Sequence, residues 1–185
     1  TDAMITFGVA VESYVAAHKA GWSSKKHADN FTQQLQLHAA RVWKRRVGTV
    51  NANDVVAIIE PLWTTKPETA SKVRSRLERV FDWASHAGFR DGPNPAAWRN
   101  GLEHRLPPLA RVQTVVPRRA VPVTDAPAVY AKLKAVDSTA AKVVQLIALT
   151  AARPSEAREA RAAEFDLDAE QPIWTVPAER AKSRR

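Results

Sequence analysis

Three basic residues, Lys72, Arg76 and Arg79, follow one another at offsets of four and three. In an α-helix this spacing places them on one face, where all three can reach the same run of phosphate groups. A guanidinium can also give two charge-assisted hydrogen bonds to a single phosphate. The stripe therefore predicts contact with a nucleic-acid backbone. A solvated helix face is the alternative explanation of the same pattern.

Other cations stand where helices are expected to begin. Lys25, Lys26 and His27 occupy the first turn of a predicted helix, and Lys66 precedes another. Cations in a first turn oppose the helix dipole, and an anionic partner would offset that unfavourable term. Hydroxyl groups on the fourth predicted helix can donate to phosphates or bases; they belong to Thr69, Ser71 and Ser75.

The composition agrees with a polyanionic partner. Lysine and arginine number 28 against 19 acidic residues, which gives a formal charge of +9 and a pI of about 10.3, as is typical of nucleic-acid-binding proteins. The absence of cysteine excludes disulfides and thiolate metal sites, and the five histidines lack ligand spacing, so we expect no metal and no cofactor. No signal sequence or membrane span is readable, and we expect a soluble, cytoplasmic protein.

Four helices are expected to position the cations of the first half. Thr6 can cap the first helix, Ser23 or Ser24 the second, and Asn53 or Asp54 the third. The fourth is expected from Pro67 to Gly88, because proline suits the first helical position and glycine the C-terminal end. A short helical piece is expected at 96–100.

The helical pattern breaks at 107–122. This stretch holds four of the 12 prolines and predicts a linker before the second half of the chain. Thr124 or Asp125 can cap the next helix, and Ser138 a further one that is apolar on nearly all sides and therefore expected to be buried. A short helix is expected at 156–163 and a strand at 173–176. The expected fold class is mainly α.

Several segments of this sequence together resemble the tyrosine recombinases, and specifically the prophage-type integrases. The catalytic side of the resemblance lies in Ala152-Arg153-Pro154-Ser155-Glu156, in 164–168, and in the strand 173–177 that leads to Glu179-Arg180-Ala181-Lys182. The front of the chain is similar to the family's core-binding domain in 63–66, 68–71, 81–84 and 94–96. The resemblance covers nearly the whole chain, and its catalytic side is the more specific part.

This resemblance implies a domain organisation and a set of partners. Residues 1–106 would form a four-helix, SAM-like core-binding domain, 107–122 a linker, and 123–185 the helical and first-strand portion of an α+β catalytic domain. The family clamps double-stranded DNA between two such domains and assembles several protomers on it. We therefore expect duplex DNA and other recombinase protomers as partners, and a monomer in solution.

The resemblance also implies roles for individual residues. Arg153 corresponds to the first catalytic arginine, which neutralises charge on the scissile phosphate; a cation that satisfies helix-terminal carbonyls is the alternative. Lys182 corresponds to the hairpin lysine that protonates the leaving oxygen. Glu156 would be a supporting partner, whereas Arg180 is expected to be solvated or to face phosphate. The predicted DNA-binding residues are Lys25, Lys26, Lys66, Lys72, Arg76 and Arg79.

The family's nucleophilic tyrosine, its second arginine and its histidines are expected downstream of residue 185. Tyr14 and Tyr130 lie on apolar helical stripes, so we expect them, like the six tryptophans, to pack in the core. The chain would then bind attachment-site DNA without completing strand transfer. Two alternatives stay open: a non-catalytic DNA-binding regulator derived from an integrase, and a helical protein-interaction module whose charge is incidental.

Overall fold

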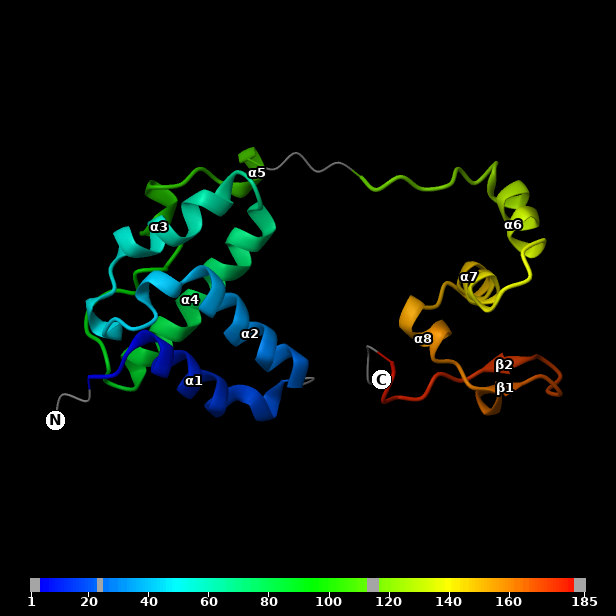
Figure 1. Cartoon of the computed structure of the whole chain (residues 1–185), viewed down its shortest axis with the longest axis horizontal. Helices are drawn as coiled ribbons and strands as arrows, with labels where there is room; N and C mark the ends of the chain where they lie inside the picture. Colours follow the sequence, from blue (N-terminus) through cyan, green and yellow to red (C-terminus); the bar gives the residue numbers. More distant parts are fainter. Residues whose placement is uncertain (1–3, 23–24, 113–116, 182–185) are drawn as a thin grey trace. The chain divides into compact units, whose positions relative to one another are not determined.

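The computed structural model describes residues 4–22, 25–112 and 117–181. The chain divides into two compact units, Thr1–Val116 and Pro117–Arg185, both drawn in Figure 1. Helices dominate the described residues, whose two short strands form a single small sheet. The expected mainly α fold class is confirmed.

The first unit is built on four helices, and the longest of them, α4, packs against the other three. These helices are α1 (Phe7–His18), α2 (Lys25–His38), α3 (Ala52–Trp63) and α4 (Pro67–His86). A one-turn helix, α5 (Leu109–Val112), follows them (Figure 1). The apolar stripe of α4 is fully buried in the common core, as its spacing predicts; its members are Val73, Leu77, Val80, Phe81 and Ala84.

Helix ends in this unit follow local side-chain chemistry. The hydroxyl of Thr6 accepts from the N–H of Val9 at 3.3 Å, which confirms the predicted cap of α1. The prediction for α3 is wrong, because Asn51 is its cap: the Asn51 side chain accepts from Asn53 N at 2.9 Å and from Asp54 N at 3.2 Å. Asp54 Oδ2 accepts in return from Asn51 N at 3.0 Å, so the two side chains form a capping box.

The bounds of α4 match the prediction closely. Pro67 stands at its N-terminal end, and Gly88, with φ of 74°, follows its last turn in the left-handed region that glycine adopts without strain. The prediction of a short helix at 96–100 is wrong, because that segment is a series of turns. Asn94 starts these turns by accepting from Ala96 N at 2.9 Å, a local bond that competes with helix formation.

The loop between α2 and α3 closes over the start of α1. Phe7 N donates to Arg45 O at 2.8 Å, and Gly8 N to Trp43 O at 2.9 Å, so the loop satisfies N–H groups at the helix end. A Cβ on Gly8 would stand 2.5 Å from Nε1 of Trp43, and only glycine admits this approach. The loop is therefore fixed against α1.

The second unit contains α6 (Ala126–Lys134), α7 (Thr139–Thr150), α8 (Pro154–Arg158), and strands β1 (Phe165–Asp166) and β2 (Ile173–Trp174). Ser138 caps α7 as predicted, with Oγ accepting from Ala141 N at 3.1 Å. The helix expected at 156–163 begins earlier and is shorter, because Pro154 starts α8. The predicted strand is present as β2, and it pairs antiparallel with β1.

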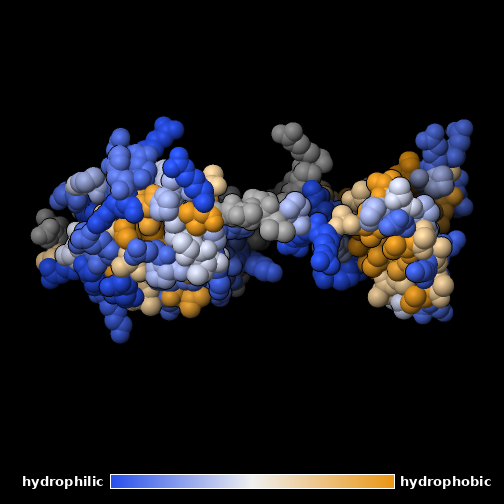
Figure 2. Space-filling view, turned by 90° about the horizontal axis from the view of Figure 1, so that it is seen from above, coloured by the Kyte–Doolittle hydropathy of each residue, from blue (hydrophilic) through white to orange (hydrophobic). Residues whose placement is uncertain are grey.

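The prediction that α7 is buried is wrong. Val144 is 48% exposed and Leu149 71% exposed, and Ala141 alone is classed as buried among the helix's residues. Figure 2 shows apolar side chains gathered on the surface of this unit. An apolar helix is buried only where neighbours cover every side, and in this unit α7 packs chiefly on α6 and α8. No helix within the described ranges is long and apolar enough to cross a membrane.

Candidate nucleic-acid interface

A groove of about 290 Å³ lies between α2 and α4 on the surface of the first unit. It is lined by His27 and Phe31 from α2 and by Ser71, Lys72, Ser75, Arg76 and Arg79 from α4. The structure thus brings together the predicted basic stripe, two predicted hydroxyl donors and one residue of the basic helix start. None of the described residues that line the groove is acidic. We call it the α2–α4 groove.

Arg76 holds the two walls of this groove together. The prediction placed it in one phosphate-contacting stripe with Lys72 and Arg79. In the structure its guanidinium donates to the backbone oxygen of Asn30 at 3.1 Å and to Asn30 Oδ1 at 2.8 Å. The same group lies over the ring of Phe31, 5.3 Å from its centroid. Burial and the nearby charge of Arg79 lower the pKa of Arg76. Arg76 is therefore first a bridge from α4 to α2.

Lys72 and Arg79 are the accessible cations of the groove. Both side chains belong to exposed residues. Lys72 faces Glu68 across 3.9 Å, with both side chains 71% exposed, and an ion pair so open to water contributes little. Arg79 makes no hydrogen bond to another described residue, so its guanidinium is available to an anion.

The other predicted DNA-binding residues lie elsewhere on the unit. Lys25 is the first residue of α2, and its side chain lies outside the described part; Lys26 is exposed beside it. Lys66 is exposed at the start of α4. Burial, together with the charge of Lys66, lowers the pKa of His38, the last residue of α2. Lys66 is not among the residues that line the groove.

A second basic surface was not assigned from the sequence, although its signal was present. The chain has no acidic residue between Asp29 and Asp54, while Arg41, Lys44, Arg45 and Arg46 follow one another closely. We call 41–46 the basic loop. Arg45 is used internally, since it donates to Asp54 Oδ1 at 2.6 Å and to Thr49 O at 2.9 Å. The other three cations are exposed.

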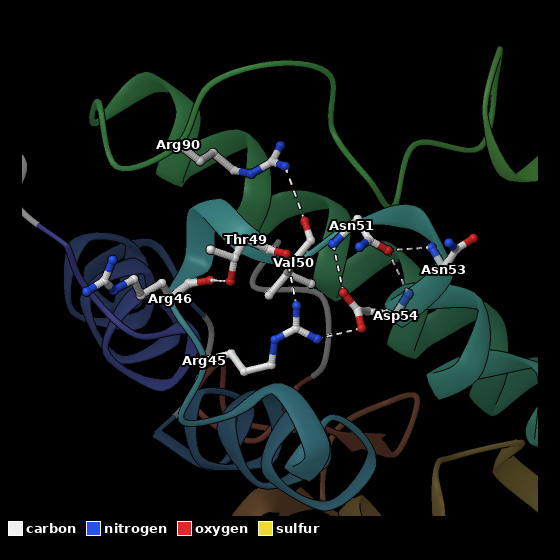
Figure 3. A network of polar contacts seen from close by, with 8 residues as sticks. All are labelled: Arg45, Arg46, Thr49, Val50, Asn51, Asn53, Asp54 and Arg90. Atoms are coloured by element: carbon white, nitrogen blue, oxygen red, sulfur yellow. Dashed lines mark hydrogen bonds and ion pairs between the residues drawn. The ribbon is translucent and has the colours of Figure 1, made fainter.

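Asp54 ties the basic loop to α3 (Figure 3). Burial alone would raise the pKa of its carboxyl, but the hydrogen bonds from Asn51 N and from Arg45 outweigh burial and lower the pKa below its ordinary value. The carboxylate thus stays charged at neutral pH and serves both the helix cap and the loop. In the same view the backbone oxygen of Arg46 accepts from the Thr49 hydroxyl, whereas the Arg46 side chain points away from the network.

In the second unit Arg153 stands directly before α8, where Glu156 holds it. Nη1 of Arg153 donates to Glu156 Oε1 at 2.8 Å, and its backbone N donates to Glu156 Oε2 at 3.0 Å. The Glu156 side chain is 9% exposed, whereas that of Arg153 is 51% exposed. The guanidinium is thus oriented by a buried carboxylate and still reaches solvent, as binding of an external phosphate requires.

Lys182 lies outside the described residues, but the segment that leads to it is anchored. Arg180, expected to be solvated or phosphate-facing, instead forms an ion pair with Glu164, whose carboxylate also accepts from Trp174 Nε1 at 3.1 Å. Arg180 Nη1 lies 3.5 Å from the backbone oxygen of Glu156. Glu164 therefore joins β2 to the 177–181 turn, and Arg180 links that turn to α8. Sequence reasoning missed this role.

The pKa of the Glu164 carboxyl predicts how the stability of the second unit depends on pH. Burial raises its pKa, but the hydrogen bonds from Trp174 and Arg180 outweigh burial and lower it. A lowered folded-state pKa gives stability that is present above the ordinary value of about 4.3 and lost as the pH falls through the folded pKa. In an acid titration the indole N–H signal of Trp174 should shift with a midpoint below that value.

The variant Glu164→Gln should abolish this transition. The control Glu170→Gln, at an exposed residue, should retain it. An unchanged titration of the Trp174 signal in Glu164→Gln would contradict the assignment.

The family model matches most of the first unit, and one curated relative aligns with nearly the whole chain. Residues 7–101 match the family model described as the phage integrase central domain. The chain is 28% identical over 187 aligned residues to "Prophage integrase IntZ" of Escherichia coli (strain K12), covering 97% of this chain. It spans 42% of that relative's length. A solution NMR structure of protein Nmul_A0922 from Nitrosospira multiformis is 39% identical with a TM-score of 0.51, over 54% of this chain and 95% of that one.

Proposed function

Because this chain belongs to the phage integrase family of tyrosine recombinases, we propose that it acts in site-specific recombination and binds double-stranded DNA through the α2–α4 groove. The observation that carries the proposal is the convergence of Lys72, Arg79 and His27 with two serine hydroxyls in one groove. Cations supply sequence-independent attraction to phosphates, and hydroxyls add short-range donors.

The groove's construction supports the same ligand. Arg76 and Arg79 are close enough that the charge of one lowers the pKa of the other. Arg76 is fixed by Asn30 and Phe31, so its positive charge is held beside that of the exposed Arg79. A phosphate that enters the groove would be attracted by both charges.

Binding of a labelled duplex across a salt series tests this function. In the double variant Lys72→Gln, Arg79→Gln, the slope of log affinity against log salt should become shallower by about 1.8, since each phosphate contact contributes about 0.9. Affinity should fall, and the melting temperature should stay unchanged because both side chains are exposed.

The matched control is Arg99→Gln, Arg111→Gln, which removes two exposed cations outside the groove. In this control the slope of log affinity against log salt should change less than it does in the groove variant. If both double variants change the slope equally, binding is governed by net charge and the groove is not the interface. A salt-independent response of the unaltered chain would favour the alternative of a protein-interaction module.

For the second unit we propose that Arg153 binds the scissile phosphate and that Glu156 orients it. A planar guanidinium with one edge held by Glu156 keeps other N–H groups for phosphoryl oxygens. Lys182 would protonate the leaving oxygen, in line with the family resemblance. Other recombinase protomers would join on DNA, and the free chain would be a monomer, which sedimentation in the absence of DNA tests directly.

A further inference from the structure

We propose that the basic loop is a second phosphate-binding surface, which engages the same duplex as the α2–α4 groove. The inference rests on the proposed function and extends it to a surface at the other end of α2. Its exposed cations are Arg41, Lys44 and Arg46. No hydrogen bond or salt bridge joins these three side chains to the residues that the structure describes.

The backbone of the basic loop is held in one conformation by contacts with the rest of the first unit. Val42 within the loop and Val47 directly after it are 0% exposed, and Val50 is 1% exposed, so buried valines anchor the segment in the core. Its carbonyls accept from the first N–H groups of α1, and Arg90 donates to Val50 O at 3.4 Å. Figure 3 shows Arg45 turned toward Asp54 and Arg46 directed away from it. Fixed cations lose less conformational entropy on binding than mobile ones.

The spacing of the two surfaces fits one duplex. From His27, in the groove, to His38, just before the loop, an α-helix rises about 16 Å. Duplex DNA carries one charge per about 1.7 Å of its axis, so a site longer than about ten base pairs can offer phosphates to both surfaces.

The composition of the loop favours a phosphate backbone over an acidic polypeptide. Val42 is buried and Trp43 is half-buried, so 41–46 presents cations without an exposed apolar anchor. Protein interfaces depend on such anchors, whereas nucleic-acid backbone contacts are largely electrostatic. Acidic polypeptide is therefore the competing occupant that the experiment must separate.

The test uses the full chain with Arg41→Gln, Lys44→Gln, Arg46→Gln, and the control Arg99→Gln, Arg111→Gln, Arg118→Gln, which removes three other exposed cations. In a duplex salt series the loop variant should lose up to about 2.7 units of slope, about 0.9 for each phosphate released. Its melting temperature should match that of the unaltered chain. Combined with the groove substitutions, the two losses of slope should add.

The outcomes separate this inference from the proposed function. If the loop variant loses no more slope than its control, the second surface is refuted even where the groove variant is impaired. If the loop variant loses slope while the groove variant does not, the loop stands and the groove assignment fails. Poly-glutamate is the second probe: a loop variant that binds duplex normally but poly-glutamate more weakly would assign the loop to an acidic protein and overturn the proposal.

Discussion

Replacing Trp63 with alanine should lower the stability of the first unit by about 3–5 kcal/mol, the usual range for removing a buried tryptophan. The Trp63 side chain is 2% exposed. It stacks on Trp98 with ring centroids 5.5 Å apart, and its Nε1 donates to Pro107 O at 2.8 Å. Trp63 thus packs in the core and also holds the segment around Pro107 by a hydrogen bond. Urea denaturation, followed through the amide signals of α3 and α4, measures the loss.

Trp63→Phe is the control that separates these two contributions. Phenylalanine keeps an aromatic ring in the core but cannot donate to Pro107, so it should lose less stability than alanine. Both variants should perturb the amides of α5, because both release Pro107. A Trp63→Ala chain that unfolds at the same urea concentration as the unaltered chain would contradict the assigned packing.

Arg76→Lys should lower the stability of the first unit by about 1–2 kcal/mol, although it preserves the charge. Lysine cannot bond both oxygens of Asn30 in the same planar geometry or lie flat on Phe31. Arg79→Lys is the matched control, and it should change stability by less than about 0.5 kcal/mol because Arg79 is exposed. Denaturation of the two variants under identical conditions makes the comparison.

A double-mutant cycle between Arg76→Lys and Asn30→Ala isolates the bridge between α4 and α2. Contacting residues should show a non-additive effect, whereas independent surface residues should add. Arg76→Lys should also weaken duplex binding, since the groove walls would lose their common anchor. Additive stability effects, with duplex affinity unchanged, would show that Arg76 does not organise the groove.

The parts of the fold that local sequence decides were predicted well. Helix α4 has a proline at its start, a glycine after its end and an apolar stripe between them. Each of these features acts within a few residues, and all three predict the same helix. The cap of α3 was misplaced because Asn51, Asn53 and Asp54 are all good capping residues. The mutual bonds of Asn51 and Asp54 decide between them, and they follow from backbone geometry.

Long-range contacts explain the remaining differences. Spacing put Arg76 in one stripe with Lys72 and Arg79, but its partner Asn30 is distant in sequence and becomes a neighbour only when α2 packs on α4. Arg180 and Glu164 meet because β1 and β2 pair. The apolar pattern of α7 indicates which side chains favour burial. It does not indicate whether other elements of the fold cover those side chains. Helix α5 lies within the proline-rich stretch that was predicted to be a linker.

Titration of a short duplex into the isotopically labelled chain, followed at each backbone amide by NMR, locates the DNA-binding surface. We expect the largest shifts in the α2–α4 groove, at His27, Ser71, Lys72 and Ser75, and a second group of shifts in the basic loop. Both groups of shifts should become smaller together as the salt concentration is raised. Shifts confined to the unit Pro117–Arg185, or no shifts at any salt concentration, would contradict the assignment of DNA binding to the first unit.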